Sequence, residues 1–505
     1  MDFVLCDELL QEILQRLPPS SAPSVSLVSK RWLSLLRSST TSISIRIPSS
    51  PTNSPSPSSP SSTSSTTTPS LSSILSYYPY LSNLTILGDT IIADDHLDPH
   101  APEPLSSSDT LLLTVATAAC SRRLAQLRFF PTAPVSPSAL LSSASSFTFL
   151  TSLQLTSLLP LSFRWLASFP SLRSLSLVQT RHKQPYHRPA AADDDDDDVE
   201  DGGDRIHAAL PLETLSLSRI RAADRGLSWL WRRCANLLWL QLRDCEGTGD
   251  GPSSSSFPLC LRGLLGLELR TCRTIADWVL RRAADHCQCL SSLLLYDGGS
   301  RDALRHFIDR RGAALRTLDL RLPLDLHNDH LFAIAADNQL GSGLAALRLQ
   351  SCCLVTGDGL RSIARAPAGA AIEELALVNC DVVEREPGLL TFLGQSMRQL
   401  RRLDLSYNEM LMDKEVGSML ASCQNLVDIR IRGCRALTGA SVLSMLKYCA
   451  RLLQVVDITQ CPRIGIHAIE LLILNACRLS QIIVEESKVS EAAKAWVSRK
   501  AIKID

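Results

Sequence analysis

The stretch Leu400-Arg401-Arg402-Leu403-Asp404-Leu405-Ser406-Tyr407-Asn408 decides the fold, because its order of apolar and polar positions recurs along most of the chain. The shared frame is Leu-x-x-Leu-x-Leu-x-x-Asn/Cys. Regular copies follow one another at steps of 25 to 29 residues and begin at Leu237, Leu264, Leu290, Leu315, Leu344, Ile372, Leu400, Leu426, Leu453 and Leu479. A step this constant predicts one repeated unit, each copy burying its apolar face against its neighbours.

The frame is the signature of a leucine-rich repeat, which predicts a curved α/β solenoid of about 13–15 strand-turn-helix repeats. Weaker copies precede the regular ones, which start at about residue 237, and begin at Leu81, Leu124, Leu150, Leu172 and Leu212. The helical half is clearest after Thr438, a cap candidate, where one face carries Val442, Met445, Leu446 and Cys449. Residues 487–505 read as a C-terminal cap that contains a helix and the closing strand 501–504.

Composition shifts set the predicted domain boundaries. Residues 1–42 form a helical unit, 43–72 a disordered linker, and 73–505 the solenoid. The linker is nearly all Ser, Thr and Pro, which cannot bury enough surface to offset the entropy of ordering. Polar insertions interrupt the repeats within 88–109, at about 180–207 and within 246–256. The second holds the unbroken run Asp193–Asp198, which favours a solvated loop. The alternative is that this acidic loop covers the strand face as a lid and that its aspartates pair with basic residues there.

The charges of the chain balance, with 51 basic and 51 acidic side chains among 505 residues. Without a basic excess or a Lys/Arg cluster, the sequence gives no case for nucleic-acid binding. The apolar runs are shorter than the roughly 18 residues of a membrane span, and the N-terminal residues lack the zones of a signal peptide. We therefore expect neither a nucleic-acid nor a membrane partner, and a location in the cytoplasm or nucleus.

The sixteen cysteines are explained by the repeat. Six stand at its ninth position, where an inward side chain packs against the turning backbone, namely Cys245, Cys272, Cys352, Cys380, Cys434 and Cys461. Reduced structural thiols are expected. The Cys287-Gln288-Cys289 and Cys352-Cys353 pairs lack a second pair at zinc spacing, so the sequence predicts no metal site. We also expect no cofactor and no catalytic residues, because no cysteine or serine is placed with an evident base.

The first 42 residues carry more apolar surface than a segment of that size can bury alone. Asp7 is a candidate cap for a helix that runs to Leu17 and ends at Pro18-Pro19. A second apolar stretch, Val25 to Val28, leads to Trp32. An unfilled apolar face, open to a partner, is therefore predicted.

The pattern Leu5-Cys6-Asp7-Glu8-Leu9-Leu10-x-x-Ile13-Leu14-x-x-Leu17-Pro18, followed by Val25-Ser26-Leu27-Val28-Ser29-Lys30-Arg31-Trp32, resembles an F-box. Cys6 stands where the family usually has proline, and the loop 18–24 lacks the family's common charged residues. The resemblance implies that the helical face binds the Skp1 adaptor and, through it, a cullin-RING ubiquitin ligase. The implied contacts are Leu5, Leu9, Ile13, Leu17, Leu27 and Trp32. The alternative is a helical cap on the solenoid.

The strand residues at the fifth and seventh repeat positions are expected to project from the concave face, in columns about 4.8 Å apart. In the fifth column, opposite charges on adjacent strands are expected to pair: Asp319 with Arg348, and Asp404 and Asp457 with Arg430. The seventh column is basic at one end and suggests capture of an acidic or phosphorylated segment by Arg243, Arg270, Tyr296 and Arg321. The alternative is a solvated basic stripe, partly paired with Asp244 or Glu268.

Helical unit and repeats together are similar to F-box proteins whose cysteine-containing leucine-rich repeats recruit substrates to SCF-type ubiquitin ligases, as in plants. This resemblance implies a non-catalytic adaptor with an unidentified protein substrate. Two other functions remain open: an interaction scaffold without any ligase, and a small-molecule-dependent receptor with an inositol phosphate inside the solenoid. The sequence lacks the dense Lys/Arg cluster that such a cofactor needs.

Overall fold

The computed structural model describes residues 5–17, 21–47, 70–88, 107–131, 133–157, 162–179, 209–221, 226–247, 254–323, 325–336 and 343–504. The chain forms two compact units. Unit one comprises Met1–Leu237 and Gly251–Cys260, and unit two comprises Leu238–Asp250 and Leu261–Asp505. The predicted acidic insertion, about 180–207, lies outside the described residues, as do most of the other two insertions and residues 48–69 of the predicted linker.

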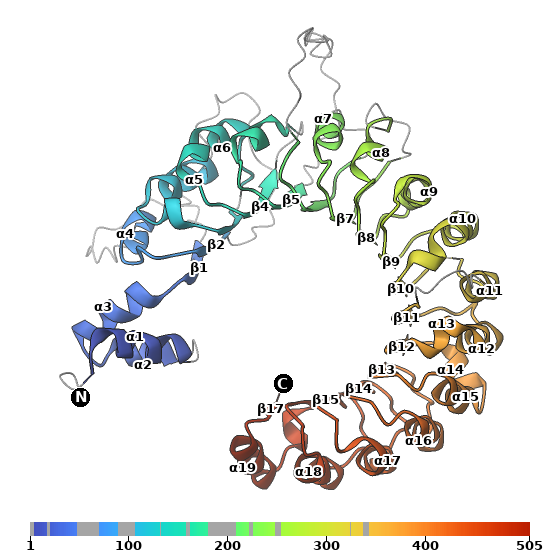
Figure 1. Cartoon of the computed structure of the whole chain (residues 1–505). Coiled ribbons are helices and arrows are strands. Elements are labelled where there is room, and N and C mark those ends of the chain that lie inside the picture. Colours follow the sequence, from blue (N-terminus) through green and yellow to red (C-terminus); the bar gives the residue numbers. More distant parts are fainter. Residues whose placement is uncertain are drawn as a thin grey trace, which may run out of the picture. The chain divides into compact units, whose positions relative to one another are not determined.

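Unit one begins with three helices and continues with parallel strands in chain order (Figure 1). Its helices are α1 (Asp7–Arg16), α2 (Ala22–Ser26), α3 (Lys30–Ser39), α4 (Leu71–Ser76), α5 (Ser107–Thr117), α6 (Pro137–Ser143), α7 (Gly226–Arg233) and α8 (Phe257–Cys260). Its strands are β1 (Ser42–Ile47), β2 (Asn83–Gly88), β3 (Gln126–Phe130), β4 (Ser152–Ser157), β5 (Ser174–Gln179) and β6 (Thr214–Ser218).

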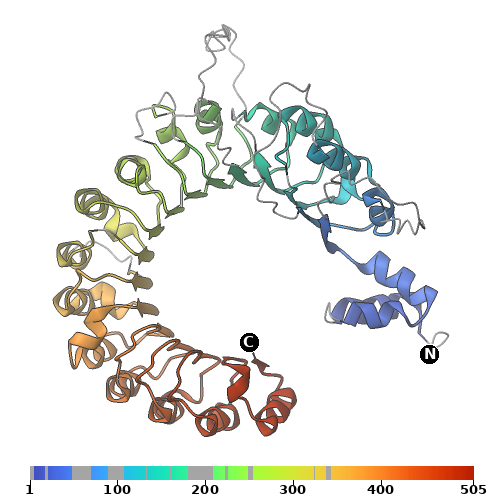
Figure 2. The same cartoon turned by 180° about the vertical axis from the view of Figure 1, so that it is seen from behind.

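Unit two alternates parallel strands with helices, and both views place its helices along the outer side of the strands (Figures 1 and 2). Its strands are β7 (Trp239–Arg243), β8 (Gly266–Arg270), β9 (Ser292–Tyr296), β10 (Thr317–Arg321), β11 (Ala346–Gln350), β12 (Glu374–Val378), β13 (Arg402–Asp404), β14 (Asp428–Arg430), β15 (Val455–Asp457), β16 (Gln481–Ile483) and β17 (Lys503–Ile504). Its helices are α9 (Ala276–His286), α10 (Arg301–Arg311), α11 (Asn328–Ala336), α12 (Gly357–Arg365), α13 (Pro367–Ala370), α14 (Asp381–Arg385), α15 (Leu389–Ser396), α16 (Asp413–Ser422), α17 (Gly439–Cys449), α18 (Ile466–Asn475) and α19 (Glu491–Lys500).

The chain folds as predicted: a small helical unit is followed in the sequence by a leucine-rich-repeat solenoid. The described residues hold 17 strands, more than the 13–15 repeats expected. One addition is the closing strand β17, which the sequence indicated. The other is β1, which pairs with β2 in full register. Residues 43–47 therefore belong to the sheet, which corrects the linker boundary at 43. The alternation Ile43, Ile45, Ile47 is the strand signal that the neighbouring Ser-rich sequence concealed.

The leucines of the frame form the core. In the copy that begins at Leu400, the side chains of Leu400, Leu403 and Leu405 are all fully buried, and apolar counterparts occupy the same positions in the other regular copies. Helix α17 confirms the predicted second half: Thr438 caps it by accepting a hydrogen bond from the amide of Ala440 at 3.2 Å. Val442, Met445 and Cys449 are buried on its inner face, so strand and helix bury one shared apolar layer.

The ninth-position side chains bond to the backbone of the preceding repeat. The thiols of Cys434 and Cys461 donate to the carbonyls of Leu405 and Ile431 at 3.1 and 3.0 Å. Asn408 does the same at Leu377 and also donates to Leu405, both at 2.8 Å. A small donor at this position satisfies a carbonyl that the turning strand leaves without a partner. The expectation of buried structural thiols is confirmed at all six ninth-position cysteines.

The eighth position turns the chain out of each strand. Ten consecutive copies have a residue with left-handed backbone geometry there: Arg219, Asp244, Thr271, Asp297, Leu322, Ser351, Asn379, Tyr407, Gly433 and Gln460. The amides of this position donate to the seventh-position carbonyl of the next copy, for example from Asn379 to Ser406 at 2.9 Å. Nine of the ten are not glycine, so each turn holds a strained backbone that the inter-repeat hydrogen bond offsets.

Candidate functional site

Helix α1 is apolar on two sides. Leu10 and Leu14 point into a small core with Val25 and Leu35. Leu9, Ile13 and Leu17 lie at i, i+4 and i+8 and are 50%, 43% and 38% exposed. Residues at this spacing form one stripe along a helix. The predicted apolar face therefore divides: one half holds the three helices together, and the other half is a surface stripe.

The remaining predicted contacts of the helical unit lie outside this stripe. Leu27, between α2 and α3, is 86% exposed. Leu5 and Trp32 are half-buried and pack against the core, so they combine a structural role with some accessible surface. The indole Nε1 of Trp32 is buried and has no hydrogen-bond partner among the described residues.

Arg31 joins the start of α1 to the start of α3. Its guanidinium donates to the carboxylate of Asp7 at 2.6 and 2.9 Å and to the carbonyl of Leu5 at 2.9 Å. Asp7 is therefore the first residue of the helix and a partner of Arg31. The helix cap is Cys6, without a side-chain hydrogen bond, which corrects the expected role of Asp7. This connection fixes the direction of the α1 stripe relative to α3.

The second candidate surface is the strand face of unit two, on the inner side of its strands (Figure 1). The register places Arg243 beside Arg270, Arg270 beside Tyr296, and Tyr296 beside Arg321. The four predicted substrate-binding residues thus form one row across β7 to β10, as the frame indicated. Whether they bind a substrate stays a prediction.

Each arginine of this row has an acidic partner from the fifth position. Arg243 and Arg270 share Glu268, with Arg243 Nη2 3.3 Å from Oε1 and Arg270 Nε in direct contact with the same oxygen. Arg321 forms a two-pronged pair with Asp319 at 2.7 and 2.8 Å. Asp319 accordingly holds the pKa of Arg321 above its ordinary value. The two arginines beside Glu268 carry one more positive charge than their partner neutralises.

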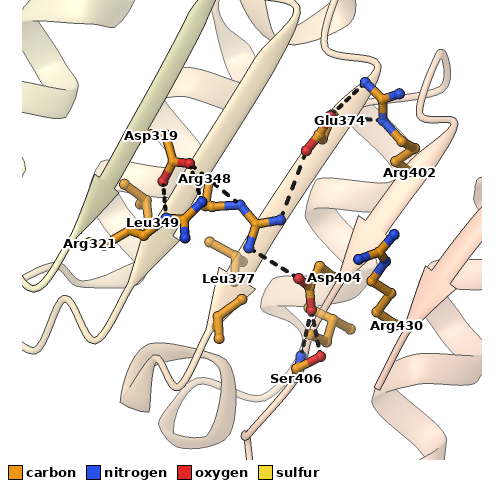
Figure 3. A network of polar contacts seen from close by, with 12 residues as sticks. Asp319, Arg321, Arg348, Leu349, Glu374, Leu377, Arg402, Asp404, Ser406 and Arg430 are labelled. Carbon is orange, nitrogen blue, oxygen red and sulfur yellow. Dashed lines mark hydrogen bonds and ion pairs between the residues drawn. The ribbon is translucent and has the colours of Figure 1, made fainter. Parts of the chain in front are cut away.

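Farther along, Arg348 is the centre of a larger network (Figure 3). It lies 3.8 Å from Asp319, 4.0 Å from Glu374 and 3.2 Å from Asp404. The expected pair of Asp319 and Arg348 is present, although Arg321 is closer to the same carboxylate. Glu374 also pairs with Arg402 at 2.6 Å. Except for the exposed Arg402, these charged side chains are at least half-buried, and they pair with one another.

The expected pairing of Arg430 with Asp404 and Asp457 is wrong. Arg430 binds Asp428 of its own strand at 2.9 and 3.1 Å, and Figure 3 shows it apart from Asp404. Asp404 and Asp457 instead accept hydrogen bonds from the residues two places on, Ser406 and Thr459. Side chains two residues apart on one strand lie on the same face and can contact each other. The expectation considered only pairs between adjacent strands.

The third repeat position was missed as a part of this face. It supplies Glu374 and Arg402 to the network around Arg348, and Asp428 as the partner of Arg430. It also supplies Trp239 on β7. The Trp239 ring lies flat against Gly266 of β8, where an added Cβ would stand 2.1 Å from the ring. The indole is 44% exposed on the strand face. A glycine inside a strand, next to an aromatic residue, is the sequence signal that could have found it.

Several of the buried thiols are poor nucleophiles, because burial raises their pKa. Burial raises the pKa of Cys234 and Cys434 to about 12 and that of Cys423 to about 11. All sixteen cysteines are free. In the part of the chain that the structure describes, no group of three His, Cys, Asp or Glu side chains is arranged to hold a metal ion. Within the same residues, no helix combines the length and apolar character needed to cross a bilayer.

Residues 3–41 match the family model of the F-box domain. Among solved structures, the chain is similar to one in the crystal structure of the Rad7 and Elc1 complex in yeast, with 14% identity over 80% of this chain and 88% of that chain and a TM-score of 0.45. It is also similar to an internalin from Listeria monocytogenes, with 12% identity over 57% and 84% and a TM-score of 0.30. The solenoid is assigned from the parallel strands and helices that repeat along the chain.

Proposed function

We propose that this chain, an F-box domain followed by a leucine-rich-repeat array, is the substrate-recruiting adaptor of an SCF-type ubiquitin ligase. In this role the F-box holds a Skp1-like adaptor, and the strand face of unit two holds the protein to be ubiquitinated. The chain performs no chemistry of its own, because proximity is its whole contribution. Such a role is exercised in the cytoplasm or nucleus, where the free thiols described above stay reduced.

The apolar stripe of α1 is the observation that carries the proposal. Three large side chains at helical spacing remain accessible although the helix already has a complete inner face. Burying a leucine side chain contributes about 1.5–3 kcal/mol, so an accessible stripe within a domain of this family favours a protein partner. Leu27 adds a fourth accessible apolar side chain in the same small unit.

On the strand face, Arg243, Arg270, Tyr296 and Arg321 are the proposed contacts for an acidic or phosphorylated segment of the substrate. The shared partner Glu268 leaves one positive charge to be met there. Trp239 lies on the neighbouring part of the same face and offers a flat apolar surface. Arginine and tryptophan are the residue types that most often dominate a protein interface.

The test is binding of a purified Skp1-like adaptor to the full chain. Leu9→Asp combined with Ile13→Asp places two charges in the stripe without touching Leu10 or Leu14. We expect adaptor binding to fall at least about a hundredfold, since charges in the centre of an apolar interface are strongly unfavourable. Leu141→Asp is the matched control, because Leu141 on α6 is 51% exposed and lies outside the F-box. Adaptor binding that survives the double substitution would refute the proposal and leave an interaction scaffold without a ligase.

Substrate capture is tested separately, by affinity purification after proteasome inhibition. Arg243→Glu, Arg270→Glu and Arg321→Glu reverse the charge of the row, and proteins captured by the wild-type chain should be lost. Arg281→Glu reverses an exposed charge on α9, away from the strand face, and should leave capture unchanged. If the chain with all three charge reversals captured the same proteins as the Arg281→Glu control, the basic row would have no part in substrate binding. The adaptor role would be unaffected by that result.

A further inference from the structure

Arg432 differs from the other arginines on the strand face of unit two. Six of these have an acidic partner, and they are Arg243, Arg270, Arg321, Arg348, Arg402 and Arg430. Arg432 stands at the seventh position after β14 and, among the residues that the structure describes, makes neither an ion pair nor a hydrogen bond through its guanidinium. Its Nε is buried without an acceptor, which leaves the charge to be met at Nη1 and Nη2.

The acids at the fifth position of the two adjacent copies have other hydrogen-bond partners. Asp404 precedes it by one repeat and accepts hydrogen bonds from the amide and hydroxyl of Ser406 and from Arg348. Asp457 follows by one repeat, is buried, and accepts from the amide and hydroxyl of Thr459. Asp404 thus binds Ser406 and Arg348, and Asp457 binds Thr459. Among the described residues, neither carboxylate forms a salt bridge with the guanidinium of Arg432.

The surroundings hold Arg432 in place. Its backbone carbonyl accepts from the amide of Tyr407 at 2.6 Å, and its guanidinium carbon lies 5.7 Å from the centre of the Tyr407 ring. The ring itself rests on Gly433, where an added Cβ would stand 2.7 Å from it. A cation near an aromatic ring is weakly attracted to it and loses conformational freedom. The side chain is thus pre-positioned without being paired.

We propose that Arg432 and Tyr407 form an anion-binding site for a carboxylate or phosphate group. A half-buried guanidinium gains more from a bound anion than an exposed one does, because water screens the pair less. Its fork of donors fits the oxygens of either group. That the anion belongs to a captured protein rests on the adaptor function; the binding of an anion at this position does not.

The probes are inorganic phosphate and acetate, each titrated into the full chain bound to its Skp1-like adaptor at constant ionic strength. Line broadening of the phosphorus-31 signal, or of the carboxyl carbon-13 signal of labelled acetate, reports binding. We expect saturable broadening with at least one probe below about 50 mM, and the stronger response identifies phosphate or carboxylate as the preferred group. Arg432→Gln should weaken that binding about tenfold, the loss of one charge-assisted contact.

Arg402→Gln is the matched control, because Arg402 is on the same face but is paired with Glu374. It should change the binding less than about twofold. Arg432→Lys keeps the charge without the fork and should fall between wild type and Arg432→Gln. Equal binding by wild type and Arg432→Gln, or no saturable binding of either probe, would overturn the site. Adaptor binding is measured on the same samples; its loss in the wild-type chain would count against the adaptor function and not against the anion site.

Discussion

Arg348 and Asp404 form an ion pair across an intervening strand. Arg348 lies on β11 and Asp404 on β13, and Nη1 and Oδ2 are 3.2 Å apart. Between them, at the same position of β12, stands Ala376, which is fully buried. Alanine has a short side chain, which leaves room for the arginine to reach past this position, and Figure 3 shows the guanidinium of Arg348 pointing toward Asp404. The side chain of Arg348 thereby joins three repeats, although the fifth position of the middle repeat is the uncharged Ala376.

Filling this space should break the connection. Ala376→Leu would place a branched side chain where the guanidinium crosses, and we expect the free energy of unfolding to fall by about 1–3 kcal/mol. Urea denaturation measures it. Ala346→Leu, on β11 and half-exposed, adds the same atoms away from the crossing and should change stability by less than about 0.5 kcal/mol. Equal effects of the two substitutions would mean that the ion pair does not depend on the size of residue 376.

Alanine substitutions at three glycines distinguish the cost of a strained backbone from the cost of a steric clash. Gly433 has a φ of 72° and its added Cβ would stand 2.7 Å from Tyr407; Gly388 has a φ of 81° with open space; Gly465 has open space and an ordinary φ. Gly433→Ala should therefore cost the most, about 2–4 kcal/mol, Gly388→Ala about 1–2 kcal/mol, and Gly465→Ala the least. Thermal unfolding of the three variants gives the order. A Gly388→Ala cost equal to that of Gly433→Ala would show that the Tyr407 contact is unimportant.

Asp413 joins α16 to the start of α17. Burial alone would raise its pKa, but hydrogen bonds from the hydroxyl of Ser441 and from the amide and hydroxyl of Thr438 bring the pKa below the ordinary 3.8. A lowered folded-state pKa contributes stability that is complete above the unfolded-state pKa and is lost as the pH falls through the folded-state pKa. Asp413→Ala should cost about 2–4 kcal/mol at pH 7.

The difference in the free energy of unfolding between wild type and Asp413→Ala should begin to shrink as the pH falls below about 3.8, where the unfolded-state carboxyl takes up its proton. It should be lost as the pH falls through the lower folded-state pKa. Urea denaturation between pH 7 and pH 3 measures this. Asp381→Ala is the control: its carboxylate forms an exposed pair with Arg385 and should contribute no more than about 0.5 kcal/mol. If the difference in unfolding free energy between wild type and Asp413→Ala did not change with pH, the ionised carboxylate would not be the source of the stability.

Asn408 tests the ninth position. Its amide group donates to the carbonyls of Leu377 and Leu405, and its oxygen accepts from the amide of Cys380 at 2.9 Å. Asn408→Ala removes the partner of the Leu377 carbonyl and of the Cys380 amide, whereas the Leu405 carbonyl keeps the hydrogen bond from the Cys434 thiol. We expect a cost of about 2–4 kcal/mol in the free energy of unfolding. Asn408→Cys restores the thiol-to-carbonyl bond of the other copies and should cost less, by about 1 kcal/mol or more. Equal unfolding free energies for the two variants would show that the thiol hydrogen bond contributes nothing.

The repeat fold could be predicted from residues such as Leu400, Leu403 and Leu405, because a leucine at a fixed step must point inward in every copy. The same reasoning placed Arg243 beside Arg270 in the correct register. β1 was missed because its short alternation borders a Ser-rich stretch, and Trp239 was missed because the third position was not considered as part of the face. Both are local patterns that a stricter use of the two-residue period could have found.

The sequence by itself determined which side chains are buried, which lie on the strand face, and that α1 has more apolar surface than its own core uses. These follow from periodicity, since burial of apolar residues sets the register of each repeat. Only the tertiary structure decided which charges meet. Whether Asp404 pairs with Arg348 or Arg430 depends on the length of each side chain, on the small size of Ala376 and on the hydroxyl of Ser406, and these combine only in three dimensions. For the same reason Arg432, one basic residue among many in the sequence, is set apart only by the engagement of the acids around it.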